Sequence, residues 1–203
     1  STSETYGSAI YTPIDELHPL QGQSPYSASK ISADKLAESY YNSFKTPVIT
    51  VRPFNTYGPR QSSRAVIPTI ISQLLTEDKL ILGDLSPVRD FTYVEDTANG
   101  FICAANNHEH IGEVINLGYG KASSIGEISE LIMKIMGIHK EIISENSRIR
   151  PKDSEVIQLI SNNNKAKELI KWEPNTDLEH GLEKTIEFIS ANLDIFRTNL
   201  FNI

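Results

Sequence analysis

The sequence predicts an α/β fold with at least some parallel sheet. Short runs rich in β-branched and apolar residues alternate with longer segments whose apolar residues recur every three or four positions. Asn, Gly and Pro separate many of these segments. Strands that alternate with helices along 203 residues are typical of an α/β protein, and no internal repeat or low-complexity linker interrupts the pattern.

The first half of the chain begins with "STSETYG", which we expect to be the end of a strand running into a loop. Residues 25–44 are predicted to be a helix because their apolar residues have helical spacing and Pro25 suits a first turn. The β-branched run 46–54 predicts a buried strand, and Asn, Gly and Pro predict a loop over 55–61. The next predicted elements are a helix over 65–76, a short strand over 79–83 and an extended segment over 89–94.

In the second half, the clearest local signal is a capping box formed by Ser124 and Glu127. It predicts a helix over 125–136 that ends at Gly137, the residue type that most readily adopts the left-handed conformation. Acidic residues near the start of 95–107 favour a helix there through the helix dipole. The remaining predictions are strands over 113–118 and 140–143 and helices within 162–172 and 177–193.

Composition narrows the classes of partner. The chain is 39% hydrophobic and 22% charged, as in ordinary globular proteins, and its net charge of −7 argues against a nucleic-acid partner. Cys103 is the single cysteine, so no intrachain disulfide forms; this suits a reducing compartment, and we expect a cytoplasmic protein. The sequence contains no run of 18 apolar residues, so we expect no membrane partner. It contains no C-x-x-C or H-E-x-x-H motif, so we expect no metal site.

The stretch "SPYSASKISADKL" places Tyr26 and Lys30 four residues apart, on one face of the predicted helix. A tyrosine ordinarily titrates near pH 10, and an ammonium group one turn away favours its phenolate form. The pair is therefore suited to accept a proton from a hydroxyl and to return it. The same spacing is common by chance, and the alternative is a surface lysine beside a packed tyrosine.

Further motifs accompany this pair in order, and together they resemble the extended short-chain dehydrogenase/reductases of the NAD-dependent epimerase/dehydratase family. The resemblance implies an NAD-dependent enzyme acting on a nucleotide sugar. It also implies the C-terminal part of a Rossmann-type doubly wound sheet plus a smaller α/β substrate-binding lobe. Residues 1–60 would belong to the NAD-binding Rossmann domain. Residues 61–203 would belong mainly to the lobe, with about 89–110 returning to the Rossmann domain. The matching motifs are "STSETYG", "QSPYSASKISADKL", "VRPFNTYGPRQ", "AVIPTIISQLL", "RDFTYVEDTANGF", "EVINLGYG" and "RPKDSEV".

The family's glycine fingerprint for the dinucleotide, G-x-x-G-x-x-G, is not in this sequence; Gly112, Gly118 and Gly120 have other spacings. We therefore expect the chain to be a piece of a longer protein, inactive and a poor NAD binder by itself. In related enzymes the 25–44 helix joins a four-helix bundle, so we expect a homodimer at full length. Whether Leu36, Tyr40 and Phe44 face a partner or the core stays open at this stage.

The resemblance also assigns catalytic roles. Tyr26 and Lys30 serve in catalysis and contact NAD, and Thr2 holds the reacting hydroxyl. A nucleotide-sugar 4,6-dehydratase needs a base and an acid to remove the C5 proton and expel the C6 hydroxyl, which Glu4 with Ser3 can supply. A 4-epimerase does not use Glu4. The Thr-Ser-Glu pattern also occurs in uronic-acid decarboxylases, and the alternative for Glu4 is a loop carboxylate facing water.

The loops around "GPRQSSRAVIP" and "LGDLSPVRD" resemble dehydratases that act on nucleotide-activated N-acetylglucosamine in nonulosonic (legionaminic-type) acid synthesis. The prediction is thus a 4,6-dehydratase of a UDP- or GDP-N-acetylhexosamine, with a 4-epimerase or an inactive fragment as alternatives. The implied substrate contacts are phosphate for Asn55, diphosphate for Arg89 and Arg150, ribose or base for Asp153, and the base for Arg64. For each arginine the alternative is a solvated surface charge.

Overall fold

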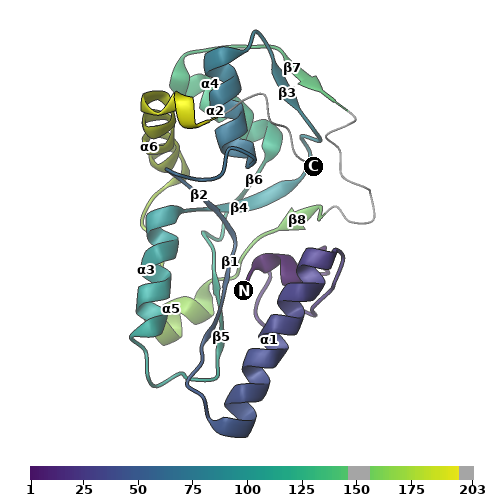
Figure 1. Cartoon of the computed structure of the whole chain (residues 1–203), viewed down its shortest axis with the longest axis vertical. Helices are drawn as coiled ribbons and strands as arrows, with labels where there is room; N and C mark the ends of the chain where they lie inside the picture. Colours follow the sequence, from purple (N-terminus) through teal and green to yellow (C-terminus); the bar gives the residue numbers. More distant parts are fainter. Residues whose placement is uncertain (146–155, 197–203) are drawn as a thin grey trace.

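The computed structural model describes residues 1–145 and 156–196 of the chain. The molecule is elongated, with two regions stacked along its long axis (Figure 1). The lower region has a pair of parallel strands flanked by helices. The upper lobe has three helices, short strands and the ends of a second sheet. The bounds of the lower elements are η1 (Ser3–Tyr6), α1 (Pro25–Phe44), β1 (Thr50–Pro53), α3 (Val94–Ala105), β5 (Val114–Leu117) and α5 (Asn164–Ile170).

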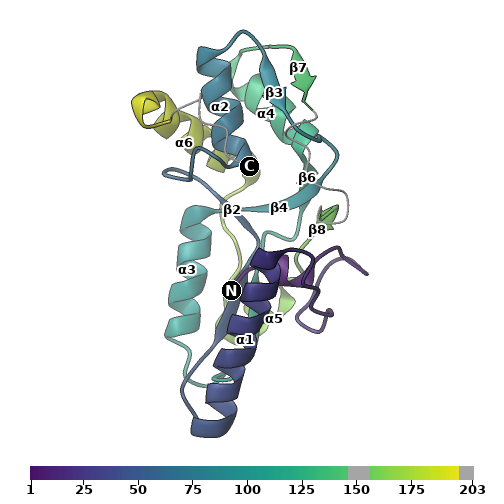
Figure 2. The same cartoon turned by 45° about the vertical axis from the view of Figure 1, so that its right-hand side comes forward.

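In the lower region, the two faces of the β1–β5 pair have opposite character. The strands are parallel, with Arg52 opposite Asn116. Successive side chains of a strand point to opposite faces. Val51 and Ile115 accordingly pack with Trp172 in an apolar cluster beneath α3 and α5, whereas Arg52 faces α1 and binds Asp34 there. Figure 2 shows α1 in front of the strands, with α3 to its side.

The upper lobe is built around three helices that share one apolar core. One large apolar cluster joins α2, α4 and α6 to the strands, and Ile70, Ile128 and Leu182 are completely buried in it. Strand β4 pairs in parallel with β2 and β8 and antiparallel with β6, while β3 and β7 form a separate parallel pair. The bounds are β2 (Asn55–Tyr57), α2 (Val66–Thr76), β3 (Leu80–Leu82), β4 (Val88–Tyr93), β6 (Ala122–Ser124), α4 (Ile125–Met136), β7 (Ile142–Ser144), β8 (Gln158–Leu159), α6 (Leu178–Ala191) and η3 (Leu193–Ile195).

A buried carboxylate joins segments where the two regions meet. Asp90 of β4 accepts hydrogen bonds from the backbone N–H groups of Tyr119 at 2.7 Å, Gly120 at 2.8 Å and Ser161 at 3.0 Å. Burial raises the pKa of Asp90 to about 6, although these three donors favour the ionised carboxylate. The loop after β5 and the segment after β8 are thereby held against β4.

The predicted α/β class with parallel strands is confirmed. The helices over 25–44 and 125–136 are confirmed, including the Ser124–Glu127 capping box and Gly137 in the left-handed conformation. Three predictions were wrong or incomplete. Residues 3–6 form a 3-10 turn instead of a strand end, Asn55–Tyr57 form strand β2 instead of a loop, and strands β6 and β8 were not predicted. In the part of the chain that the structure describes, no helix has both the length and the hydropathy needed to cross a membrane.

Candidate active site

The Thr2-Ser3-Glu4 segment is held in a tight turn by its own side chains. Thr2 has an extended backbone just before η1, and its Oγ1 accepts a hydrogen bond from the Glu4 N–H at 3.3 Å. The Thr5 hydroxyl donates to the Thr2 carbonyl at 2.8 Å. Ser3 is buried, whereas Thr2 and Glu4 are half-buried. A turn of this kind fixes the direction in which Glu4 leaves the backbone.

The Tyr26–Lys30 pair lies in the first two turns of α1. Ser24 caps the helix by accepting from the Ser27 N–H at 3.1 Å, and Pro25 occupies a first-turn position where no N–H is needed. The Lys30 Nζ lies 5.7 Å from the centroid of the Tyr26 ring, and Tyr26 is 53% exposed. The predicted neighbourhood of the two side chains is therefore present, and the tyrosine is open to a ligand. Helix α1 also packs against η1, which brings the two predicted catalytic segments together.

A cleft of about 300 Å³ gathers three of the predicted site residues, Glu4, Asn55 and Arg89. They come from η1, the start of β2 and β4, so segments far apart in the sequence meet here. Arg89 is 7% exposed and donates to the carbonyl oxygens of Val88 at 3.1 Å and Ile157 at 3.4 Å. The cleft thus combines a carboxylate, an amide and a guanidinium group.

The other predicted residues lie elsewhere. Lys30 lines a separate groove of about 590 Å³, together with Asp34 and the edge of β1. Arg64 is exposed and does not line the cleft, although the next residue, Ala65, does. Arg150 and Asp153 lie outside the described residues.

Gln61 also lines the cleft, although no sequence pattern predicted a role for it. Its Nε2 donates to the Thr56 carbonyl at 2.9 Å. Its Oε1 and the Oδ1 of Asn55 are both buried and, among the described residues, have no hydrogen-bond partner. The available signal was its position at the end of "NTYGPRQ", six residues after Asn55. Buried polar atoms ordinarily have partners, so these two acceptors are suited to donor groups of a ligand.

Within residues 1–145 and 156–196, His, Cys, Asp and Glu side chains form no group of three that could hold a metal ion.

The family model for GDP-mannose 4,6-dehydratase matches residues 1–185. The chain belongs to this family. The match also confirms the predicted membership of the NAD-dependent epimerase/dehydratases. The mouse dTDP-D-glucose 4,6-dehydratase is 31% identical over 95% of this chain and 55% of its own length.

Two solved structures of related enzymes superimpose closely. The dTDP-glucose 4,6-dehydratase of Bacillus anthracis, in complex with NAD, has a TM-score of 0.88 at 33% identity, covering 96% of this chain and 61% of that one. The UDP-glucuronic acid 4-epimerase of Bacillus cereus, in complex with UDP-glucuronic acid and NAD, has a TM-score of 0.88 at 32% identity, covering 95% and 60%. The family therefore includes both dehydratases and epimerases. The chain spans between 55% and 62% of the length of several curated relatives.

Proposed function

We propose that the chain carries the catalytic and substrate-binding residues of an NAD-dependent nucleotide-sugar 4,6-dehydratase. The observation that carries the proposal is the position of Glu4. It lines the cleft with Asn55 and Arg89, while its own turn, η1, packs against the helix that carries Tyr26 and Lys30. A dehydratase needs a carboxylate between its substrate-binding groups and its proton-accepting tyrosine, and an epimerase does not.

NAD is the proposed cofactor, and the residues here fit one side of its site. Two related structures were solved with NAD. Tyr26 is half exposed with the Lys30 ammonium beside its ring, so the pair is accessible to a ligand. When bound, NAD would supply the hydride acceptor and donor. The glycine fingerprint for the pyrophosphate is not among the residues of this chain, so its residues account for only the Tyr26–Lys30 side of that site.

The remaining steps follow from the side chains. Tyr26 accepts the proton of the sugar C4 hydroxyl, with Lys30 stabilising the developing phenolate and Thr2 holding the hydroxyl. Once C4 is a ketone, the C5 proton is acidic. Glu4 removes this proton and passes it to the C6 hydroxyl, which leaves as water, so that a C5–C6 double bond forms. This double bond then takes up a proton at C5 and, at C6, the hydride that bound NADH would supply. Ser3 is buried beside Glu4 and is assigned a supporting role in this acid–base step.

Substrate binding is assigned to the cleft. The Arg89 guanidinium group is suited to the oxygens of a diphosphate, and the Asn55 amide to the same group. Arg64 directly precedes Ala65, which lines the cleft, and is proposed to contact the base. Arg150 and Asp153 remain proposals as contacts to diphosphate and to ribose or base. We propose a UDP- or GDP-N-acetylhexosamine as the substrate.

The lower region of the structure supports a proposal about how the domains of the full protein are organised. Among the described residues, β1 pairs only with β5, and an apolar-lined groove runs along its other edge between α1 and α3. This free edge supports the proposal that residues 1–60 belong to an NAD-binding sheet and 61–203 mainly to a substrate lobe. Leu36, Tyr40 and Phe44 form an exposed apolar row on α1, which supports a homodimer. A cytoplasmic location is proposed on the single cysteine, which suits a reducing compartment.

The test uses the protein expressed from its complete coding sequence. It is incubated with NAD⁺ and a panel of UDP- and GDP-hexoses, including both N-acetylglucosamine nucleotides, and product mass is followed. Loss of one water supports the dehydratase. An unchanged mass with a new epimer would instead assign the 4-epimerase that several relatives' names suggest.

Two variants assign the roles. Tyr26→Phe is expected to lower kcat by roughly 10² to 10⁴, because it removes the acid–base group. Glu4→Gln is expected to abolish loss of water while leaving oxidation of C4 intact. Asp84→Asn is the matched control, since Asp84 is another carboxylate lining the same cleft and has no assigned role. Equal loss of dehydration in Glu4→Gln and Asp84→Asn would remove the special role of Glu4.

A further inference from the structure

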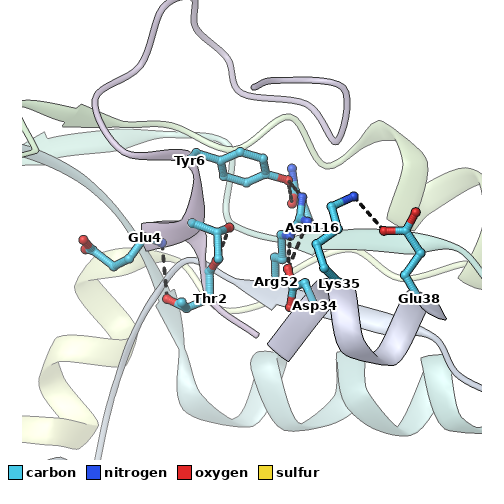
Figure 3. A network of polar contacts seen from close by, with 9 residues as sticks. Thr2, Glu4, Tyr6, Asp34, Lys35, Glu38, Arg52 and Asn116 are labelled. Atoms are coloured by element: carbon cyan, nitrogen blue, oxygen red, sulfur yellow. Dashed lines mark hydrogen bonds and ion pairs between the residues drawn. The ribbon is translucent and has the colours of Figure 1, made fainter. Parts of the chain in front are cut away.

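Four buried polar side chains from four different elements form one network (Figure 3). They are Tyr6 at the end of η1, Asp34 on α1, Arg52 on β1 and Asn116 on β5. None of them is more than 7% exposed. None of them has a role in the proposed reaction.

Arg52 is the centre of the network. Its Nε and Nη2 both lie 3.0 Å from Asp34 Oδ2, and its Nη1 donates to the Tyr6 hydroxyl at 2.9 Å. The Tyr6 hydroxyl in turn donates to Asn116 Oδ1 at 2.7 Å. The guanidinium carbon also lies 4.9 Å from the centroid of the Tyr6 ring. One side chain therefore contacts both η1 and α1.

Such a network is a poor source of stability but a good source of orientation. Removing two charges from water costs about as much as their attraction returns, so a buried ion pair contributes little net stability. The fork of a guanidinium group, however, accepts only a narrow range of partner positions. Burial raises the pKa of the Tyr6 hydroxyl, and Arg52 opposes that effect, so the hydroxyl stays protonated and able to donate to Asn116.

The two elements that Arg52 joins are the two that carry the proposed catalytic groups. Tyr6 lies two residues after Glu4 in the same 3-10 turn, and Asp34 lies one helical turn after Lys30 and two after Tyr26. We propose that Arg52 and Tyr6 are positioning residues: they fix the Thr2–Glu4 turn relative to the Tyr26–Lys30 helix so that both act on one sugar ring. This inference rests on the proposed function.

The test breaks the Arg52–Tyr6 link in two ways in the protein expressed from its complete coding sequence. Tyr6→Phe removes the hydroxyl and keeps the ring. Arg52→Lys keeps the charge beside Asp34 but lacks the fork that also reaches Tyr6. Both are expected to lower kcat about 10- to 100-fold, with KM for UDP-N-acetylglucosamine and NAD⁺ changed less than about twofold, because small misplacements of catalytic groups slow the reaction.

Hydrogen exchange without NAD⁺ or substrate gives a second readout. Both variants are expected to exchange faster at residues 2–6 and in the first turns of α1. The control is Lys35→Met, which breaks the exposed Lys35–Glu38 pair on the next residue of the same helix, at 2.6 Å. It should change neither kcat nor exchange at residues 2–6.

The outcomes separate this inference from the proposed function. If Tyr26→Phe is inactive but Tyr6→Phe and Arg52→Lys keep full kcat, the positioning role is wrong and the catalytic assignment stands. If Tyr26→Phe keeps full activity, the proposed function itself fails. If both network variants lose their circular dichroism and their thermal transition, the network is structural and the positioning role is overturned.

Discussion

Helix α1 and helix α2 differ in how much of their surface is buried and in the kind of contacts that hold them. Of the twenty residues of α1, only Ser27 and Asp34 are buried, whereas α2 buries seven of its eleven, most of them apolar. The upper lobe therefore has its own apolar core. The lower region holds α1 mainly through polar contacts and leaves Leu36, Tyr40 and Phe44 exposed. The helix that carries the proposed catalytic pair thus depends on orientation by hydrogen bonds and on surfaces that a partner can cover.

The largest expected effect on stability comes from removing the carboxylate that binds Arg52. Asp34→Ala leaves a guanidinium group buried without its charge partner, which costs about 3–5 kcal/mol. We expect hydrogen exchange to speed up in α1, β1 and β5 while α2 and α4 stay protected. The matched change in the lobe is Ile132→Ala, a fully buried apolar residue whose truncation costs about 2–5 kcal/mol. If either variant speeds up hydrogen exchange equally in both regions, the two regions do not differ in the way proposed.

The free energy of unfolding is expected to depend on pH through Asp90, which lies where the two regions meet. Its pKa is raised from 3.8 to about 6 by burial, so its stabilising contribution is complete below pH 3.8 and is lost as the pH rises through about 6. The gap in unfolding free energy between the wild type and Asp90→Asn should shrink by about 2–3 kcal/mol from about pH 4 to about pH 7. Urea unfolding at the two pH values measures it.

Asp84 serves as a control of opposite sign. Hydrogen bonds from Ser86 lower its pKa, so its contribution is present above its ordinary pKa and is lost as the pH falls. The gap between wild type and Asp84→Asn should therefore be small and should grow with pH. A gap for Asp90→Asn that also grows with pH would contradict the raised pKa.

The same capping motif occurs in both regions and allows a smaller, matched test. Ser124 caps α4 and Ser24 caps α1, each through a capping box. Alanine at either position is expected to cost about 1 kcal/mol. Thermal unfolding measures the loss, and only Ser24→Ala should also lower activity, because Tyr26 lies two residues later. Equal activity in the two variants would mean that the start of α1 tolerates fraying.

The smallest effect on folding, and the most informative on assembly, is expected from Phe44→Glu. Phe44 is 73% exposed, so the free energy of unfolding of a monomer should change by less than about 0.5 kcal/mol. If the apolar row on α1 is a dimer surface, the substitution shifts the sedimentation of the protein toward the monomer. Lys35→Met, on the same helix, should not. A monomer at high concentration of the protein expressed from its complete coding sequence would contradict the homodimer.

Sequence patterns predicted features whose causes are local. Pro25, the Ser124–Glu127 box and Gly137 mark helix ends through contacts within a few residues, and these boundaries were predicted correctly. Residues 55–57 are predicted as a loop because Asn55 and Gly58 favour turns, but they form strand β2 because they pair with β4, more than thirty residues away. Short strands such as β6 carry no periodic pattern of their own.

The residues of the candidate site were predicted mainly from the resemblance to a known family and less from sequence periodicity. No periodicity indicates that Glu4, Asn55 and Arg89 line one cleft, since they come from three elements. The buried pairing of Arg52 with Asp34 had one usable signal, a charged residue within the β-branched run "TPVITVRPF". A charge at such a position is rarely buried unless it is paired, but the sequence does not name the partner.

The bond between Tyr6 and Asn116 has a consequence for the order of folding. It joins residues 110 positions apart, whereas Asp34 and Arg52 are separated by 18. Closing a longer loop costs more chain entropy, and contacts between distant residues slow folding. The Tyr6 hydroxyl can contact both its partners only when β5 lies beside β1, because Arg52 is on β1 and Asn116 is on β5. We therefore expect the Thr2–Glu4 turn to be among the last parts of the chain to reach its native position.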